Sequence, residues 1–177
     1  MKSDPRALST ALSPRPPIGA HFSTAGGLHR ALEQAAALDC GIAQLFTASP
    51  RQWQAPPLDA ETAARFRETR NRTGVQPISH AAYLINLAGG EATGPRSRAA
   101  FEDELRRCQS LEIPLLVVHP GTAVDPGETE AIRRIAAVLD ETLESSGNTI
   151  TTVLLETTAG QGRSIGHTFE QLAAILD

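Results

Sequence analysis

The chain has 177 residues, which is enough for one domain with a sizeable core and too few for two ordinary domains. A hydrophobic fraction of 41% and a charged fraction of 20% exclude a largely disordered chain, a coiled coil and a collagen-like polymer. The net charge of −4 means that any contact with DNA has to be local. No stretch approaches the ~18 apolar residues of a membrane span, so we expect no membrane partner.

The first 17 residues contain four prolines and no apolar run of the kind that a secretory signal needs. We expect residues 1–17 to be a flexible tail and residues 18–177 to be one folded domain. Cys40 and Cys108 do not form a Cys-x-x-Cys pair and cannot make a disulfide framework. We therefore expect both to be reduced core thiols of a cytoplasmic protein.

Five short apolar runs, each followed by a helical pattern, predict buried strands. They contain Ile, Val and Leu without strict alternation, as strands covered on both faces do. The runs are residues 18–21, 43–46, 75–80, 115–119 and 152–156. The β-α alternation predicts a parallel sheet, either open and doubly wound or part of a barrel. Since a (β/α)8 barrel takes roughly 250 residues, only about five of its eight units fit here.

Helical periodicity and capping residues place the helices between these strands. Ser23 is a candidate N-cap of the first helix, Asp59 and Gly74 are the expected ends of the second, and Thr168 with Gln171 resembles a capping box for the last. The apolar stripes are those of Leu28, Leu32, Ala35 and Ala36, of Phe101, Leu105, Cys108 and Leu111, and of Ile132, Ile135, Leu139 and Leu143.

Four of the five strands end in a side chain that can bind a metal ion: His21, His80, His119 and Glu156. The carboxyl ends of parallel strands meet at one edge of the sheet, where ligands bind in α/β folds, so we expect a shared site there. Imidazoles with a carboxylate suit Zn²⁺, followed by Mn²⁺ or Fe²⁺. Three protein ligands leave a coordination position open for an activated water. The remaining histidines, His29 and His167, are expected on the solvated surface.

Scarce aromatic residues follow the second and third strands. Arg51 and Trp53 lie in one of these loops, and Tyr83 and Leu84 in the other. Beside a metal site, such side chains could act as wedges for bases or sugars. The alternative is that Trp53 and Tyr83 pack onto their own domain.

These segments resemble the endonuclease IV family, the zinc-dependent apurinic/apyrimidinic endonucleases of base-excision repair. The most specific motif is His-Ala-Ala-Tyr-Leu-Ile-Asn-Leu-Ala at residues 80–88. The other matching segments are residues 18–28, 45–47, 50–53, 119–121 and 156–162. The resemblance covers residues 18–177 and implies a TIM barrel with three zinc ions at its mouth. It also implies hydrolysis of the phosphodiester 5′ to abasic sites in duplex DNA.

Carried over by position, the resemblance implies that His80, His119 and Glu156 bind one zinc ion. Glu156 would also bridge to a second ion and so hold the activated water, which makes it the catalytic carboxylate. The resemblance further implies that four loop residues enter the duplex at the lesion, where a base-less nucleotide costs least to extrude. These residues are Arg51, Trp53, Tyr83 and Leu84. His21 is expected to act from outside the coordination sphere, on a ligand or on the phosphate.

The family's later motifs, which supply the remaining zinc ligands, have no counterpart in this chain. Only one ion's protein ligands are therefore complete, and we expect weak or absent nuclease activity from the isolated polypeptide. The uncovered barrel edges favour self-association. Two alternatives stay open: a non-catalytic fragment of the enzyme, and a metal-dependent sugar isomerase or epimerase, which shares the barrel and its strand-end His and Glu residues.

Overall fold

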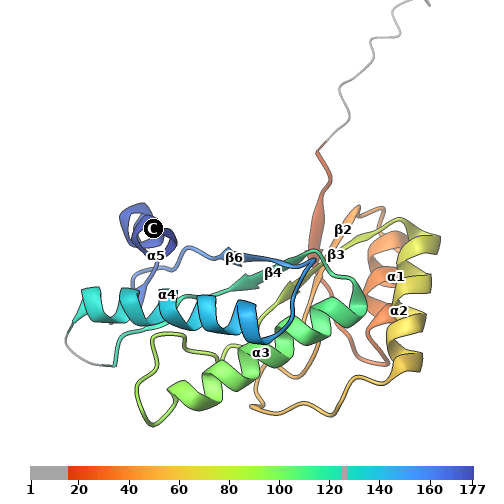
Figure 1. Ribbon diagram of the computed structural model, residues 1–177. Coiled ribbons are helices and arrows are strands. Elements are labelled where there is room, and N and C mark those ends of the chain that lie inside the picture. Colours follow the sequence, from red (N-terminus) through yellow and green to blue (C-terminus); the bar gives the residue numbers. More distant parts are fainter. Residues whose placement is uncertain (1–15, 125–126) are drawn as a thin grey trace, which may run out of the picture.

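The computed structural model describes residues 16–124 and 127–177 (Figure 1). The tail expected at residues 1–17 lies, apart from its last two residues, outside the described residues. The strands are β1 (Gly19–His21), β2 (Ile42–Leu45), β3 (Gln76–His80), β4 (Leu115–Val118), β5 (Gly121–Thr122), β6 (Thr152–Leu155) and β7 (Ser164–Ile165). The helices are α1 (His29–Ala37), α2 (Ala60–Thr73), α3 (Gly94–Leu111), α4 (Glu128–Ser145) and α5 (Phe169–Leu176).

Five strands form one parallel sheet in the order β1-β2-β3-β4-β6. Each strand pairs with the preceding strand of that sheet, so the order never reverses. A doubly wound sheet reverses its strand order partway, whereas a barrel keeps adding strands in one direction. Of the two architectures that the sequence left open, the structure therefore shows the barrel type, with five β-α units in the described residues.

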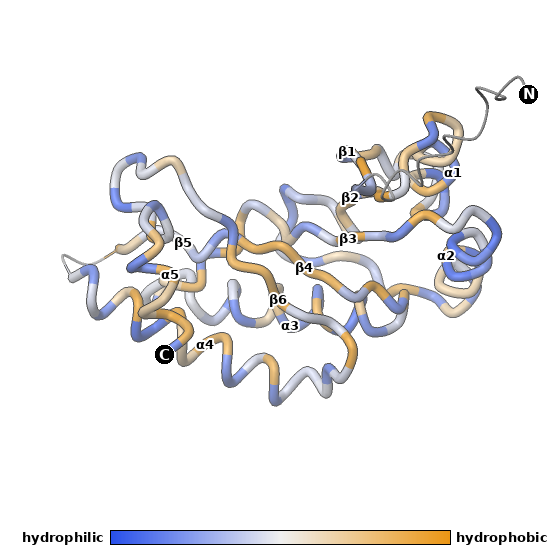
Figure 2. The backbone as a smooth tube through the Cα atoms, turned by 90° about the horizontal axis from the view of Figure 1, so that it is seen from above, coloured by the Kyte–Doolittle hydropathy of each residue, from blue (hydrophilic) through white to orange (hydrophobic). Residues whose placement is uncertain are grey.

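The helices form an outer layer in which each packs against the next, from α1 to α5. Helices α3 and α4 lie under β4 and β6, and among the described residues no helix covers the opposite face of these strands (Figures 1 and 2). The core fills the space between the sheet and the helices. Its largest fully buried side chains include Leu32, Leu45, Phe66, Phe101, Leu105, Leu116 and Ile135.

The expectation that all five strands are covered on both faces is wrong at the two ends of the sheet. All three residues of β1 are exposed, and Leu154 in β6 keeps 39% of its surface accessible. Leu154 alternates with Val153 and Leu155, which pack against the core. The sequence therefore has apolar side chains on a face that the described residues leave open.

The predicted ends of α2 and the predicted N-cap of α5 are confirmed. Asp59 accepts a hydrogen bond from the Thr62 amide at 2.7 Å, and Gly74 ends α2 in the left-handed conformation at a φ of 70°. Thr168 accepts from the Gln171 amide at 3.2 Å. Ser23 is not an N-cap: its hydroxyl accepts from the Ala25 amide in a turn, and α1 starts later without a side-chain cap.

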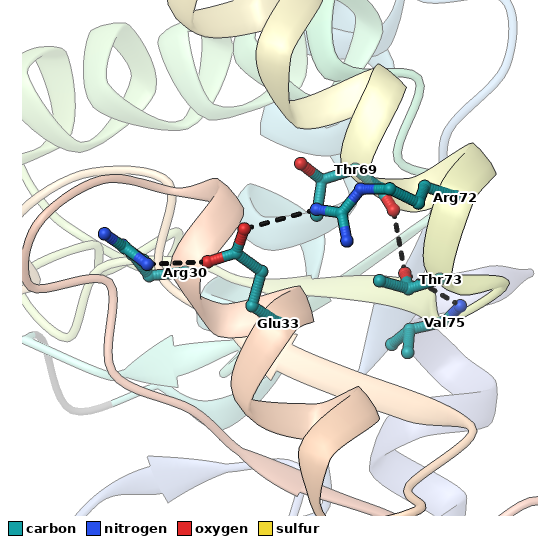
Figure 3. Close-up of polar contacts among 6 residues, drawn as sticks. All are labelled: Arg30, Glu33, Thr69, Arg72, Thr73 and Val75. Atoms are coloured by element: carbon teal, nitrogen blue, oxygen red, sulfur yellow. Dashed lines mark hydrogen bonds and ion pairs between the residues drawn. The ribbon is translucent and has the colours of Figure 1, made fainter.

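Charged side chains link the first two helices (Figure 3). Glu33 on α1 accepts a hydrogen bond from Arg30 on the same helix at 2.9 Å and one from Arg72 on α2 at 3.2 Å. At the end of α2, the Thr73 hydroxyl donates to the carbonyl of Thr69 at 2.8 Å. Exposed pairs of this kind contribute little stability, so the packing of apolar faces dominates the contact.

A second, two-stranded sheet joins the loops after β4 and β6. Strand β5 pairs antiparallel with β7 through Gly121–Ile165 and Thr122–Ser164. Strands of two residues carry no readable periodicity, and the sequence did not indicate them. The small sheet ties together the segments that follow two of the candidate metal ligands.

The two cysteines are free, and one of them lies in the core. Cys108 is fully buried, and burial raises the pKa of its thiol to about 12. Cys40 is only half-buried at the margin of the core, so the expected core position is confirmed for Cys108 alone. Within the described residues, none of the helices combines the length and the hydropathy of a membrane span.

Candidate metal centre

Three neighbouring strands deliver the candidate ligands to one edge of the sheet. His80 is the last residue of β3, while His119 and Glu156 directly follow β4 and β6. The parallel register pairs His80 with Val117 and Val118 with Leu155, so the carboxyl ends of the three strands lie level. Of the four strand-end residues that the sequence analysis expected in a shared site, these three converge and His21 does not.

The three side chains share one small space. Glu156 Oε2 lies 3.0 Å from His80 Nε2 and 3.3 Å from His119 Nε2. The three potential ligand atoms all lie within 4.8 Å of one another. Ligands at 2.0–2.2 Å from a tetrahedral zinc ion are about 3.4 Å apart, so this set fits a single ion. We call these three residues the His-His-Glu triad.

The triad combines one fixed ligand with two that face solvent. His80 is only 6% exposed, and its Nδ1 lies 2.8 Å from the carbonyl oxygen of Ala81. This distance indicates that Nδ1 carries a proton and donates it in a hydrogen bond to the Ala81 carbonyl. The lone pair of Nε2 then faces the other two members of the triad. The His119 and Glu156 side chains are 45% and 42% exposed. A substrate can therefore reach the triad from their side.

Aromatic side chains surround the triad on the side of β2 and β3. The Phe46 ring centre lies 4.5 Å from that of His21 and 5.5 Å from that of His80. Tyr83 contacts Phe46, His80 and His119, with ring centres 5.2, 5.6 and 6.3 Å away, yet it is 62% exposed. The sequence singled out Tyr83 but missed Phe46, which ends the second strand run where the other runs end in His or Glu.

His21 lies outside the triad, with its ring in contact with that of Phe46. Desolvation lowers the pKa of His21, a hydrogen bond with Gln44 opposes that shift, and the charge of His80 adds to it. His21 therefore lies beside the site, and its action on a metal ligand or on the phosphate stays a prediction.

The other loop residues expected to contact DNA differ in their exposure. Arg51 is exposed, and Trp53 and Leu84 are half-buried. A cavity of about 180 Å³ opens beside His119 and Tyr83, with Asn86 and Thr122 in its wall. Of the four residues assigned to DNA contacts, the structure brings Tyr83 directly to the triad.

The remaining two histidines differ in their surroundings. His167 is exposed, as expected, and its Nδ1 lies 2.9 Å from the carbonyl of Ser164. The expectation for His29 is wrong, because this side chain is only 6% exposed and burial lowers its pKa. His29 lies three residues before the buried Leu32, on the same face of α1, and that face packs against α2.

The strands of the parallel sheet follow one another in a single direction, and the His-His-Glu triad lies at the ends of three neighbouring strands. These features define a barrel-type protein with a candidate metal centre at the carboxyl edge of the sheet. The chain belongs to the family described as xylose isomerase-like TIM barrel, whose model matches residues 32–177. This match covers most of the domain, and it includes all three members of the triad.

Known relatives confirm the resemblance to endonuclease IV. The chain is 44% identical over 162 residues to a probable endonuclease 4 of Geobacter sulfurreducens, covering 90% of this chain and 54% of the relative. It is 40% identical over 164 residues to a probable endonuclease 4 of Chloroflexus aurantiacus, with coverage of 92% and 58%. The chain thus spans little more than half the length of these curated relatives.

Solved structures agree with the sequence relatives. The crystal structure of endonuclease IV from Thermus thermophilus superposes with a TM-score of 0.83 at 32% identity, covering 91% of this chain and 59% of that one. A D-tagatose 3-epimerase-like protein superposes with a TM-score of 0.72 at 18% identity, covering 92% and 60%. The second likeness concerns the fold alone.

Proposed function

We propose that this chain contributes to a DNA-repair endonuclease that hydrolyses the phosphodiester 5′ to abasic sites in duplex DNA. The observation that carries the proposal is the convergence of the His-His-Glu triad within 4.8 Å, in a chain about 40% identical to proteins named as probable endonuclease 4. The two free cysteines are consistent with work in the reducing cytoplasm.

The triad would hold Zn²⁺, because two imidazoles and one carboxylate match the ligands that zinc prefers. When bound, such an ion supplies Lewis-acid activation of a water for attack on a phosphodiester. His80 would act as the pre-oriented ligand, since its Nδ1 contact with Ala81 fixes the ring. Glu156 would contribute the carboxylate that touches both imidazoles.

The surrounding loops would recognise the DNA. Tyr83 presents an exposed ring beside the triad and could stack on a base or sugar at the lesion. Arg51 would place a positive charge near the phosphate backbone, which this acidic chain needs locally. Trp53 and Leu84 would serve as apolar wedges that hold the abasic nucleotide out of the stack.

Zinc binding and lesion-specific DNA binding test the proposal together. The purified chain is titrated with Zn²⁺ by calorimetry, and then with a duplex carrying a tetrahydrofuran abasic analogue or its intact counterpart. We expect one strongly bound ion and preference for the abasic duplex, both lost with chelator and in His119→Ala. His167→Ala serves as the control because His167 is an exposed histidine outside the triad.

Cleavage is measured in the same samples with an end-labelled abasic duplex. We expect weak or no cleavage from the isolated chain, because Glu156 is the only ligand of the family's other two ions that has a counterpart in it. Failure to bind zinc, or equal affinity for the two duplexes, would contradict the proposal. Zinc-dependent turnover of a ketohexose without preference for the abasic duplex would instead support a sugar epimerase.

A further inference from the structure

Two charged side chains on α3 are buried although neither belongs to the His-His-Glu triad. Glu104 is 4% exposed and Arg107 is 7% exposed. Removing a charged group from water costs several kcal/mol unless polar partners compensate, so the partners of a buried charge indicate what it holds in place.

The Glu104 carboxylate contacts two loops that leave the carboxyl edge of the sheet. The Thr47 hydroxyl donates to Glu104 Oε2 at 2.6 Å. The Ala82 backbone amide also donates a hydrogen bond to the Glu104 carboxylate. Thr47 directly follows Phe46, near the start of the loop that connects β2 to α2. Ala82 lies between His80 and Tyr83. A single carboxylate therefore ties both loops to α3.

Arg107 contacts the later part of the loop that connects β2 to α2. Its Nη1 and Nη2 donate to the carbonyl oxygen of Pro56 at 3.1 and 3.3 Å. Glu104 and Arg107 are three residues apart on α3 and lie on the same face of the helix. Together they hold this loop at Thr47 and at Pro56, and Arg51 and Trp53 lie between these two points.

The loop depends on such contacts because it has little regular structure. Residues 46–59 are all described, and they form no helix or strand. Burial raises the pKa of Glu104, while the Thr47 hydrogen bond and the charge of Arg107 oppose that shift. The Thr47 hydroxyl and the Ala82 amide are therefore among the groups that compensate the buried carboxyl group.

We infer that Glu104 and Arg107 are positioning residues, which fix the loop carrying Arg51 and Trp53 relative to the segment carrying Tyr83. Their effect on DNA rests on the proposed function, but their effect on the loop does not. The contacts act through the loops, since neither side chain belongs to the triad.

Trp53 is the only tryptophan of the chain, so its fluorescence reports on this loop alone. The test replaces the Thr47 donor in Thr47→Val and keeps it in Thr47→Ser. We expect Thr47→Val to increase acrylamide quenching of Trp53 and to weaken binding of the abasic duplex by about fivefold, the range of one lost hydrogen bond. Thr47→Ser should restore both values, and zinc affinity should stay within about twofold in either variant.

The outcomes separate this inference from the proposed function. Wild-type quenching in Thr47→Val would overturn the inference, whatever the chain does with DNA. If the wild-type chain does not distinguish the abasic duplex, the proposed function fails, and Trp53 quenching still decides the positioning role. If Thr47→Val loses its circular dichroism spectrum, Arg107→Lys replaces it, because lysine keeps the charge but cannot reproduce the two-nitrogen contact with Pro56. Unchanged quenching in folded Arg107→Lys would then overturn the inference.

Discussion

A single glycine controls how the segment after His119 leaves the sheet. Gly121 has a φ of 131°, and a Cβ added there would lie 2.2 Å from Asn86 Oδ1. That same oxygen accepts from the Thr122 amide at 2.9 Å, and the Asn86 amide group donates to the Thr122 carbonyl at 2.9 Å. The absence of a side chain at Gly121 therefore allows the loop after β3 to dock beside β5.

We predict that Gly121→Ala separates these segments and disturbs the triad. The clash and the strained backbone should cost about 1–3 kcal/mol of unfolding free energy. Zinc affinity should fall as well, because His119 lies two residues away. Chemical denaturation and calorimetry measure the two effects.

Gly162→Ala is the matched control for this prediction. Gly162 also has a positive φ, of 62°, but a Cβ there meets nothing within 4 Å. It should therefore lose some stability and keep its zinc affinity. Equal zinc affinity in the two variants would show that the Asn86 contact does not support the triad.

The sequence predicted some site residues and missed others for physical reasons. His80, His119 and Glu156 were recognisable because each ends an apolar run, where a polar side chain is unusual. Phe46 was not recognisable, since an aromatic residue at the end of a strand looks like an ordinary residue of the hydrophobic core. Glu104 was missed because a charge on a helix usually faces solvent, and its burial depends on partners far away in the sequence.

Among the helices, α5 offers a direct test of an end that the sequence predicted. Thr168 caps the helix, while the Gln171 side chain departs from the expected box: its Oε1 accepts from the Gly166 and His167 amides at 2.8 and 3.1 Å. The cap and the approach to the helix are therefore held by two different side chains.

We predict that Thr168→Ala destabilises α5 by about 1 kcal/mol, because the Gln171 amide in the first turn of the helix loses its hydrogen-bond acceptor. Hydrogen exchange over residues 169–176 should speed up, and Thr168→Ser should restore the wild-type rates. If exchange in the alanine variant matches the wild type, the packing of α5 against α4 alone keeps the helix formed.

Elements with capping residues and long periodic stripes were predictable, and short or irregular ones were not. Asp59 and Gly74 bound α2 as expected because local chemistry decides those ends. The beginning of α1 was misplaced because the Ser23 hydroxyl serves a turn instead. The β5-β7 pair arises from contacts between distant segments, which no local pattern in the sequence reports.

For the whole molecule, the open face of the sheet is the dominant feature. Among the described residues, β1 and β6 each pair with one neighbour only, and Leu154 lies exposed on the face away from the helices. Unpaired strand edges and exposed apolar side chains favour association with another chain. We propose that isolated copies of this chain associate through this face.

We predict that Leu154→Lys reduces this association, because a charge on the face would have to be desolvated in the contact. Sedimentation velocity over a range of concentrations should show a smaller fraction of dimers or larger species than in the wild type. Leu38→Lys is the control, since Leu38 is 70% exposed at the end of α1, away from the sheet. Equal reduction by both variants would point to a general effect of charge instead.

The position of Glu156 has a consequence for the stability of the sheet. His80 ends β3 and His119 follows β4, both inside the sheet, whereas Glu156 follows β6, which lies at the edge of the sheet among the described residues. A cation bound by all three side chains would link β6 to β4 and β3, since a ligand that binds only the folded state stabilises that state. The same ion that is proposed for catalysis would thus also resist separation of β6 from β4.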